Sequence, residues 1–127
     1  MLWIAAYNAH DVAQVSALYA DDVTNVQRPW GKSVVGRAAM SHTFQRIFQT
    51  FPDIHIEPDN MLIDGDRIAL EWRFSGTMRG EFAGHAPTGR AFHLQGCETF
   101  QIIDGKIHLQ NGYWDKATMF EQLGINS

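Results

Sequence analysis

The apolar residues of this chain recur with two different periods, and the change of period separates a helical first part from a strand-rich second part. From Leu2 to about Tyr19 they fall mostly at three- and four-residue spacings, which predicts an amphipathic helix packed against a core. A short extended segment is expected at 23–27. A second helix is expected from about Arg37 to Gln49, and it must end before Pro52 because proline cannot continue the helical hydrogen-bond ladder.

The period then changes to two, which is typical of β-strands with one buried face. Four strands are expected, at 54–63, 67–78, 90–103 and 106–114. Asp-Gly turns at 64–66 and 104–105 would join them in hairpins, and a last helix is expected from Lys116 to Leu123, closed by Gly124. Helices followed by antiparallel strands predict one α+β domain over residues 1–127, with a long sheet curled into a cone around two or three helices.

Composition and charge exclude several classes of protein. A chain of 127 residues, 45% of them hydrophobic, suffices for one domain with one core. The net charge of −4, with no cluster of basic residues, gives no reason to expect nucleic acid as a partner. The single cysteine, Cys97, excludes an intrachain disulfide and a cysteine-based zinc site. The N-terminus lacks the features of a signal peptide, and no apolar window approaches the ~18 residues of a membrane-spanning helix, so we expect a soluble, cytoplasmic protein that does not enter membranes.

The six histidines are dispersed, and none forms the short-spaced pair that a metal site usually needs. We therefore expect no metal ion. His85 is the one histidine with a candidate role in chemistry, because it lies in a loop between two strands, where a polar and aromatic rim would cover the mouth of a pocket.

The strand expected at 90–103 carries a carboxyl group in the middle of its apolar face. The alternate residues of that face are Phe92, Leu94, Gly96, Glu98, Phe100 and Ile102. An unpaired carboxylate in a core is costly, so Glu98 must find hydrogen-bond donors or stay protonated. It is therefore either a buried structural hydrogen-bond partner or a pocket acid with a raised pKa, unless a β-bulge turns it outward.

The neighbouring strand ends in a second acid. Alternation places Ile107, Leu109, Asn111, Tyr113 and Asp115 on one face. Asp115 then either caps the following helix or is an ionisable group at the end of an apolar pocket. Hairpin pairing about the 104–105 turn places Glu98 near 109–111 and Asp115 further along, so the two acids are not expected to form a tight dyad.

Aromatic residues supply the expected pocket walls. They come from the strand 67–78, the second helix, two loops and the end of the last strand: Trp30, Phe44, Trp72, Phe74, Phe82 and Trp114. Tyr7, Tyr19 and His85 are candidate hydrogen-bond donors to a ligand. Arg73 alternates to the outer face, which argues against an arginine-assisted addition of water to an epoxide.

Several motifs, taken together and in order, resemble the SnoaL-like polyketide cyclase or ester cyclase family. They are NAHD (8–11), FPD (51–53), GTMRGEFAGHAPTGR (76–90), DGKI (104–107), YWD (113–115) and QLG (122–124). The resemblance implies a cone-shaped, cystatin-like α+β barrel with a deep apolar pocket, a homodimer, and cofactor-free ring closure by aldol condensation. It also implies that Asp115 is the general acid/base.

Two departures from the family pattern lie near the expected pocket. Met78 stands where the family often has His, and Asn111 stands where it often has Trp. We therefore carry two hypotheses. One is a cyclase or isomerase acting on a small apolar carbonyl compound, with Asp115 as base and Glu98, Tyr7, Tyr19 or His85 as donor. The other is a non-catalytic protein of the same fold that binds a small ligand or acts as a dimeric scaffold.

Overall fold

The computed structural model describes residues 1–126, which contain four helices and six strands. In chain order they are α1 (Leu2–Asn8), α2 (Val12–Ser16), β1 (Tyr19–Gln27), β2 (Lys32–Val35), α3 (Arg37–Thr50), β3 (His55–Asp64), β4 (Arg67–Thr77), β5 (Ala91–Ile103), β6 (Lys106–Tyr113) and α4 (Lys116–Leu123). The strands form one sheet in the order β2-β1-β6-β5-β4-β3. Neighbouring strands are antiparallel except β1 and β6, which are parallel.

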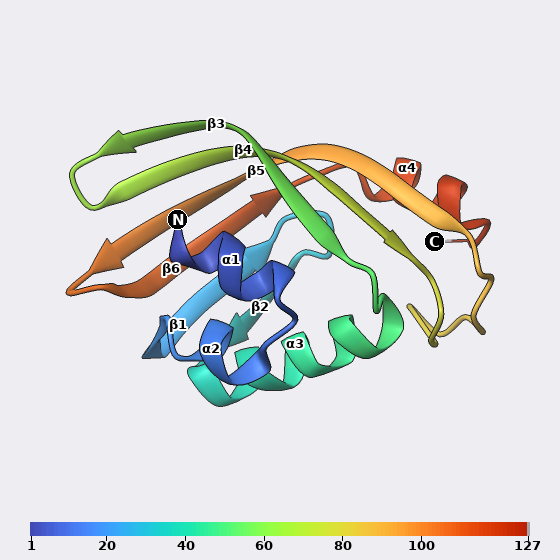
Figure 1. The fold of residues 1–127 in the computed structure, drawn as a ribbon, viewed down its shortest axis with the longest axis horizontal. Coiled ribbons are helices and arrows are strands. Elements are labelled where there is room, and N and C mark those ends of the chain that lie inside the picture. The colour runs from blue at the N-terminus through green and yellow to red at the C-terminus, as the bar shows by residue number, and fades with distance from the viewer. Residues whose placement is uncertain (127) are drawn as a thin grey trace.

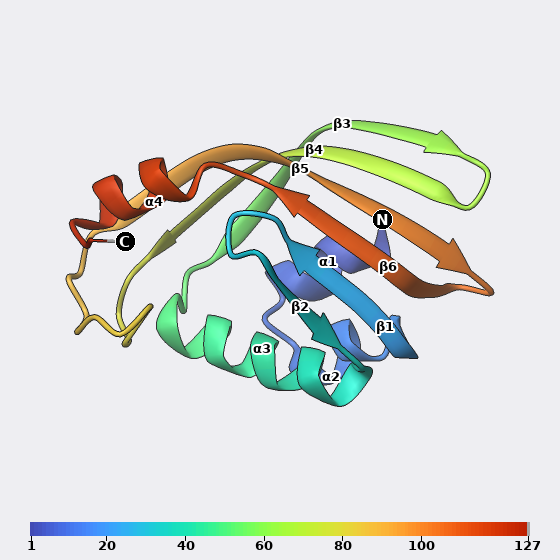
Figure 2. The same ribbon diagram turned by 180° about the vertical axis from the view of Figure 1, so that it is seen from behind.

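The sheet curves over α1, α2 and α3, while α4 lies at the far end of the sheet from the β3–β4 hairpin (Figures 1 and 2). The predicted α+β cone is thus confirmed. The sheet is mixed and does not close into a barrel, because β2 and β3 remain edge strands. None of the helices within residues 1–126 is long and apolar enough to cross a membrane.

The predicted first helix is two helices in the structure. His10 has a left-handed backbone conformation, with φ of 55°, which ends the run begun by α1. The Asp11 side chain then accepts a hydrogen bond from the Gln14 backbone N–H and caps α2. Asn8 ties the end of α1 to β3 through two hydrogen bonds with the backbone of Ile56, of 2.9 Å and 2.8 Å. The hydrogen bonds to β3 and the local cap of α2 therefore stabilise two short helices in place of the one continuous helix that was predicted.

The strands and hairpin turns after α3 lie where the alternation predicts them, within a few residues. The short strand β2, KSVV, was not predicted, because it is only four residues long and directly follows the turn-rich residues 28–31. The extended segment at 23–27 is the second half of β1, which begins at Tyr19. β1 pairs in parallel with β6, so that Gln27 lies beside Gly112 and a strand from the first part of the chain lies next to one from the last part.

A β-bulge in β6 makes the predicted common face of that strand wrong. Ile102 pairs with Ile107, yet the preceding Gln101 pairs with Leu109, so His108 is an extra residue in β6. Ile107 is buried in the core, but beyond the bulge the inward positions are 110, 112 and 114 rather than 109, 111, 113 and 115. The bulge therefore exchanges which residues of β6 face the concave side.

Candidate active site

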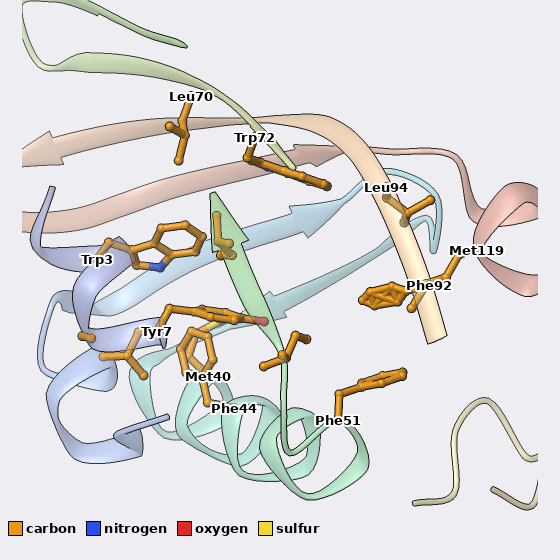
Figure 3. Close-up of a cluster of buried hydrophobic side chains, with 14 of the residues drawn as sticks. Trp3, Tyr7, Met40, Phe44, Phe51, Leu70, Trp72, Phe92, Leu94 and Met119 are labelled. Carbon is orange, nitrogen blue, oxygen red and sulfur yellow. The ribbon is translucent and has the colours of Figure 1, made fainter. Parts of the chain in front are cut away.

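A cavity of about 160 Å³ lies between the concave face of the sheet and the helices α1 and α3. Figure 3 shows side chains from the two sides of the cavity, with Tyr7 and Phe44 on the helices facing Trp72 and Phe92 on the strands. Its aromatic lining residues are Trp3, Tyr7, Trp30, Phe44, Phe51, Trp72, Phe74, Phe82, Phe92 and Trp114. The polar lining residues are Asn25, Gln27, Thr43, Glu98 and Gln110. This is a mostly apolar pocket with a few converging polar groups, as small-molecule sites usually are.

Glu98 is the carboxyl group of the cavity wall, and it is 5% exposed. Its Oε2 accepts hydrogen bonds from the side-chain amides of Gln110, at 2.8 Å, and Gln27, at 3.3 Å. Burial raises the pKa of Glu98 from 4.5 to about 7, although both amide donors act in the opposite direction. At neutral pH the group is therefore able to take up and release a proton.

The orientation of the Gln27 amide is set by an indole. Trp114 Nε1 donates to Gln27 Oε1 at 2.9 Å, and an indole nitrogen is a donor only. The amide nitrogen of Gln27 must then point the other way, where it donates to Asn25 Oδ1, at 2.9 Å, and to Glu98. The assignment of oxygen and nitrogen in this side chain thus follows from the network.

The orientation of the Gln110 amide is set in the same way from the other side. Trp3 Nε1 donates to the Tyr19 hydroxyl at 2.9 Å, and that hydroxyl donates to Gln110 Oε1 at 2.6 Å. Gln110 therefore presents its Nε2 to Glu98. Two donor-only indoles thus begin two chains of hydrogen bonds that both end on Glu98 Oε2.

The other oxygen of Glu98 is not used by the hydrogen-bond network. Glu98 Oε1 has no hydrogen-bond partner within residues 1–126, yet the only fully buried side-chain oxygen or nitrogen without a partner there is Ser16 Oγ. Glu98 Oε1 is therefore not fully enclosed and faces the cavity that Glu98 lines. Because Oε2 accepts two N–H groups, a proton on Glu98 resides on Oε1.

A glycine makes this arrangement possible. Gly112 pairs with Gln27 on β1 and with Glu98 on β5, so it lies between the two side chains that must meet. A Cβ atom at position 112 would lie 1.8 Å from Gln27 Oε1. Only a residue without a side chain lets Gln27 reach across β6 to Glu98.

The Tyr7 hydroxyl is a second polar group of the cavity. The Tyr7 ring is buried against Trp3, at 5.3 Å between ring centroids, and against Phe44 and Phe74, at 5.8 Å each. Its hydroxyl has no hydrogen-bond partner within the described part of the chain, and in Figure 3 it points into the space facing Phe92. Burial and the charge of Glu98 raise the pKa of Tyr7, so it stays protonated and able to donate.

The structure brings most of the predicted site residues to the cavity. Those that line it are Tyr7, Trp30, Phe44, Trp72, Phe74, Phe82, Glu98 and Trp114. Tyr19 lies behind the wall, in the hydrogen-bond chain to Gln110. Asn111 points away from the cavity, and its Oδ1 accepts a hydrogen bond from Arg28 at 2.5 Å. Arg73 is on the outer face, as predicted, where it pairs with Asp59 at 2.8 Å.

Asp115 and His85 do not line the cavity. Asp115 is exposed and caps α4, where its side chain accepts a hydrogen bond from the Thr118 backbone N–H at 3.1 Å. That bond lowers the pKa of the carboxyl group. His85 Nε2 lies 2.8 Å from the Asn126 carbonyl oxygen and holds the last described residues of the chain. The acid/base role that the family pattern implies for Asp115 stays a prediction.

No pattern in the sequence identifies Gln27, Gln110 and Trp3 as site residues. Gln27 reaches the site because β1 pairs in parallel with β6, and Gln110 faces inward only because of the bulge at His108. Both causes arise from the pairing of strands in the folded protein and not from a local pattern in the sequence. Among the polar residues of the Glu98 network that line the cavity, the sequence carried a signal only for Glu98, whose place on an apolar face predicted an inward carboxyl group.

The fold and the cavity together define a small α+β protein with an aromatic-lined, partly open cavity. The SnoaL-like polyketide cyclase family model matches residues 1–123, and the chain belongs to this family. No curated protein matches the chain at a significant level.

Solved structures with the same fold cover nearly the whole chain. IdmH of Streptomyces antibioticus, a proposed polyketide cyclase, is 26% identical, with a TM-score of 0.79 over 98% of this chain and 94% of that one. A proposed SnoaL-like polyketide cyclase of Shewanella denitrificans is 18% identical, with a TM-score of 0.87 over 97% and 92%. An LEH-like epoxide hydrolase of M. tuberculosis is 18% identical, with a TM-score of 0.78 over 96% and 84%. The last two identities are too low to show more than the fold.

Proposed function

We propose that the protein catalyses cofactor-free enolisation of a small apolar carbonyl compound, with Glu98 as the general acid/base. The observation that carries this proposal is the free Oε1 of Glu98, which faces an apolar cavity while Oε2 is held by two amide donors. A general base works best when its pKa lies near the operating pH. Glu98, with its pKa raised to about 7 by burial, meets that condition.

The proposed reaction begins when ionised Glu98 removes a proton from the carbon next to the carbonyl group. The electron pair of that C–H bond forms the C=C bond, and the carbonyl π electrons move to the oxygen, giving an enolate. The Tyr7 hydroxyl donates a hydrogen bond to this oxygen, where the negative charge develops. If the compound is β,γ-unsaturated, Glu98 then returns the proton to the γ-carbon, the C=C bond moves to the α,β position and the carbonyl group re-forms, which is isomerisation. Alternatively, the enolate carbon attacks a second carbonyl, and Glu98 protonates the resulting alkoxide, which completes an aldol ring closure.

The proposal assigns the proton transfer to Glu98 rather than to Asp115. An exposed carboxylate with a lowered pKa is a weak base, and Asp115 already uses an oxygen to cap α4. The family's ring closure is a further proposal for this chain, supported by the family membership. A homodimer and a cytoplasmic location are also proposed.

The test is hydrogen–deuterium exchange at the α-carbon of apolar ketones in D₂O, followed by NMR, because this readout does not require the natural substrate. Glu98→Gln should lower the enzyme-dependent exchange rate by about 10²–10⁴-fold, the usual contribution of a general base. Asp115→Asn, which keeps a helix-capping side chain, should change the rate less than about twofold. A large loss in Asp115→Asn with exchange retained in Glu98→Gln would reverse the assignment.

A non-catalytic binding protein is the second candidate, and one feature of the wall favours it. Within residues 1–126, Glu98 and Tyr7 are the only titratable side chains that line the cavity, so no second base or cation assists. If ligands bind in the cavity but α-exchange does not exceed that of buffer, this candidate replaces the enzyme.

A further inference from the structure

The volume of the cavity limits the size of its ligand. An engineered apolar cavity of about 150 Å³ binds benzene, whereas sites for drug-sized ligands usually have about 300–1,000 Å³. The cavity here has about 160 Å³. It therefore has room for one six-membered ring with a small substituent, and not for the several fused rings of an aromatic polyketide or a steroid.

The wall also limits the charge of the ligand. Within residues 1–126 no Lys, Arg or His side chain lines the cavity, and the one acidic group is Glu98. An anionic group on the ligand would be buried without a partner and close to a carboxyl group, which is strongly unfavourable. The part of the ligand inside the cavity is therefore neutral.

Among the lining residues within 1–126, two polar atoms without a protein partner remain to orient the ligand. They are Glu98 Oε1 and the Tyr7 hydroxyl, whereas the amides of Gln27 and Gln110 are already engaged in the network. A ketone would satisfy both if its oxygen accepts from Tyr7 and its α-C–H faces Glu98 Oε1, and an enol or phenol hydroxyl would do so by accepting from Tyr7 and donating to Oε1. The rest of the lining is mainly aromatic and aliphatic, which suits a hydrocarbon ring.

We propose that the cavity takes a neutral, single-ring ketone, with the ring against the aromatic wall, the carbonyl oxygen at the Tyr7 hydroxyl and the α-carbon beside Glu98 Oε1. The hydroxyl group of an enol or a phenol accepts from Tyr7 in the same place and donates to Oε1. This inference rests on the proposed enolisation for the role of the oxygen. The size limit rests on the cavity alone.

We place the mouth of the cavity at a cluster of aromatic lining residues that includes the partly exposed Trp30, and we expect a larger ligand to be blocked there. Trp30 is 37% exposed, and its ring lies 5.8 Å from the Phe82 ring and 5.7 Å from the Trp114 ring. These three residues belong to the β1–β2 turn, the loop before β5 and the segment before α4. A second fused ring would have to displace this cluster.

Phenols are suitable test ligands, because a phenol is planar, neutral and similar in shape to a cyclic enol. Calorimetric titration should show that phenol binds at least about tenfold more tightly than 2-naphthol, and that a four-ring steroidal phenol does not bind. Toluene, which has the ring without the oxygen, should bind more weakly than phenol. Glu98→Gln should weaken phenol binding about tenfold, the loss of a hydrogen bond to a charged group, and leave toluene binding unchanged.

Two variants at the mouth test the size limit. Trp30→Ala should bring 2-naphthol affinity to within about threefold of phenol affinity, whereas Trp30→Phe, the matched control, should keep the wild-type preference. Thermal unfolding of each variant verifies that it is folded.

Each contrary result has a distinct meaning. Tighter binding of two-ring or four-ring phenols by the wild-type protein would overturn the size limit and leave the proposed enolisation untouched. Phenol binding that does not depend on Glu98, or no binding of either phenol or toluene, would overturn the placement of the ligand. If phenol binds as expected and α-exchange is absent, the enolisation fails while the single-ring site stands.

Discussion

Two carboxyl groups at the same end of the sequence have opposite environments in the fold. Glu98 is buried in the cavity wall, and its pKa is raised to about 7. Asp115 is exposed at the start of α4, and its pKa is lowered by hydrogen bonds from Thr118. Burial thus prepares one acid for proton transfer, and a local helix cap keeps the other ionised. The surroundings of a carboxyl group in the fold, rather than the sequence motif that contains it, therefore determine its protonation.

The two environments also differ in how far they depend on the rest of the chain. The Asp115 cap uses a backbone N–H three residues away. The Glu98 site uses three strands, because Gln27 comes from β1 and Gln110 from β6, while Glu98 lies on β5. We therefore expect changes around Glu98 to have larger effects than changes around Asp115.

The largest expected effect on stability is the pH dependence introduced by Glu98. Below pH 4.5 the group is protonated in both the folded and the unfolded protein. Between 4.5 and about 7 the unfolded chain releases a proton that the folded protein keeps, so stability falls as pH rises. At about 1.4 kcal/mol per pH unit, this amounts to about 3 kcal/mol. The free energy of unfolding of Glu98→Gln, measured in urea relative to wild type, should therefore be about 3 kcal/mol more favourable at pH 8 than at pH 4.

Glu71→Gln is the matched control for this experiment. Glu71 lies on the neighbouring strand β4 with its side chain exposed, where it accepts a hydrogen bond from Asn60. Because solvent screens the exposed Glu71 side chain, its difference from wild type should change less between pH 4 and pH 8 than that of Glu98→Gln. A Glu98→Gln difference that is equally flat would show that Glu98 does not carry a raised pKa.

The second effect concerns the residue that lets the strands converge. Gly112→Ala should displace the Gln27 side chain and destabilise the protein by about 2 kcal/mol, because the added Cβ would overlap Gln27 Oε1. Loss of the Gln27 donor should also raise the pKa of Glu98 further, which moves the pH range of its stability effect upward.

Gly76→Ala provides the comparison for the glycine position. Its Cβ would meet Phe51 at 3.3 Å, a contact that a small shift relieves, so its destabilisation should be clearly smaller in the same urea measurement. Equal losses in the two variants would mean that Gly112 has no special relation to the Glu98 network.

The same contrast explains what could be predicted from the sequence. The inward position of Glu98 follows from alternation along β5, which is a local property, and it was predicted. The Asp-Gly turns were also predicted, and the helix start at Asp115 was one of two alternatives given for that residue. The wrong face of β6 has one physical cause, the extra residue at His108, which reverses the alternation of every residue after it.

The remaining parts of the site depend on contacts between distant segments. Parallel pairing of β1 with β6 places Gln27 beside Gly112, and no spacing within either strand indicates that partner. The split of the first helix has a similar origin, because Asn8 is bound to the backbone of Ile56. Local patterns thus predicted the elements and one acid, whereas the donors that tune that acid required the fold.

The smallest effect is expected at the exposed acid. Asp115→Ala removes the cap of α4 and should lower the melting temperature by a few degrees, on the order of what N-cap substitutions usually cost a domain of this size. Because its pKa is lowered in the folded state, the contribution of Asp115 is present above 3.8 and is lost as pH falls through the folded pKa, so the difference should shrink in acid. Asp11→Ala, which removes the equivalent cap of α2, is the matched control and should give a similar shift. A much larger loss for Asp115→Ala, with activity lost as well, would show that this carboxyl group acts in the site and not only as a cap.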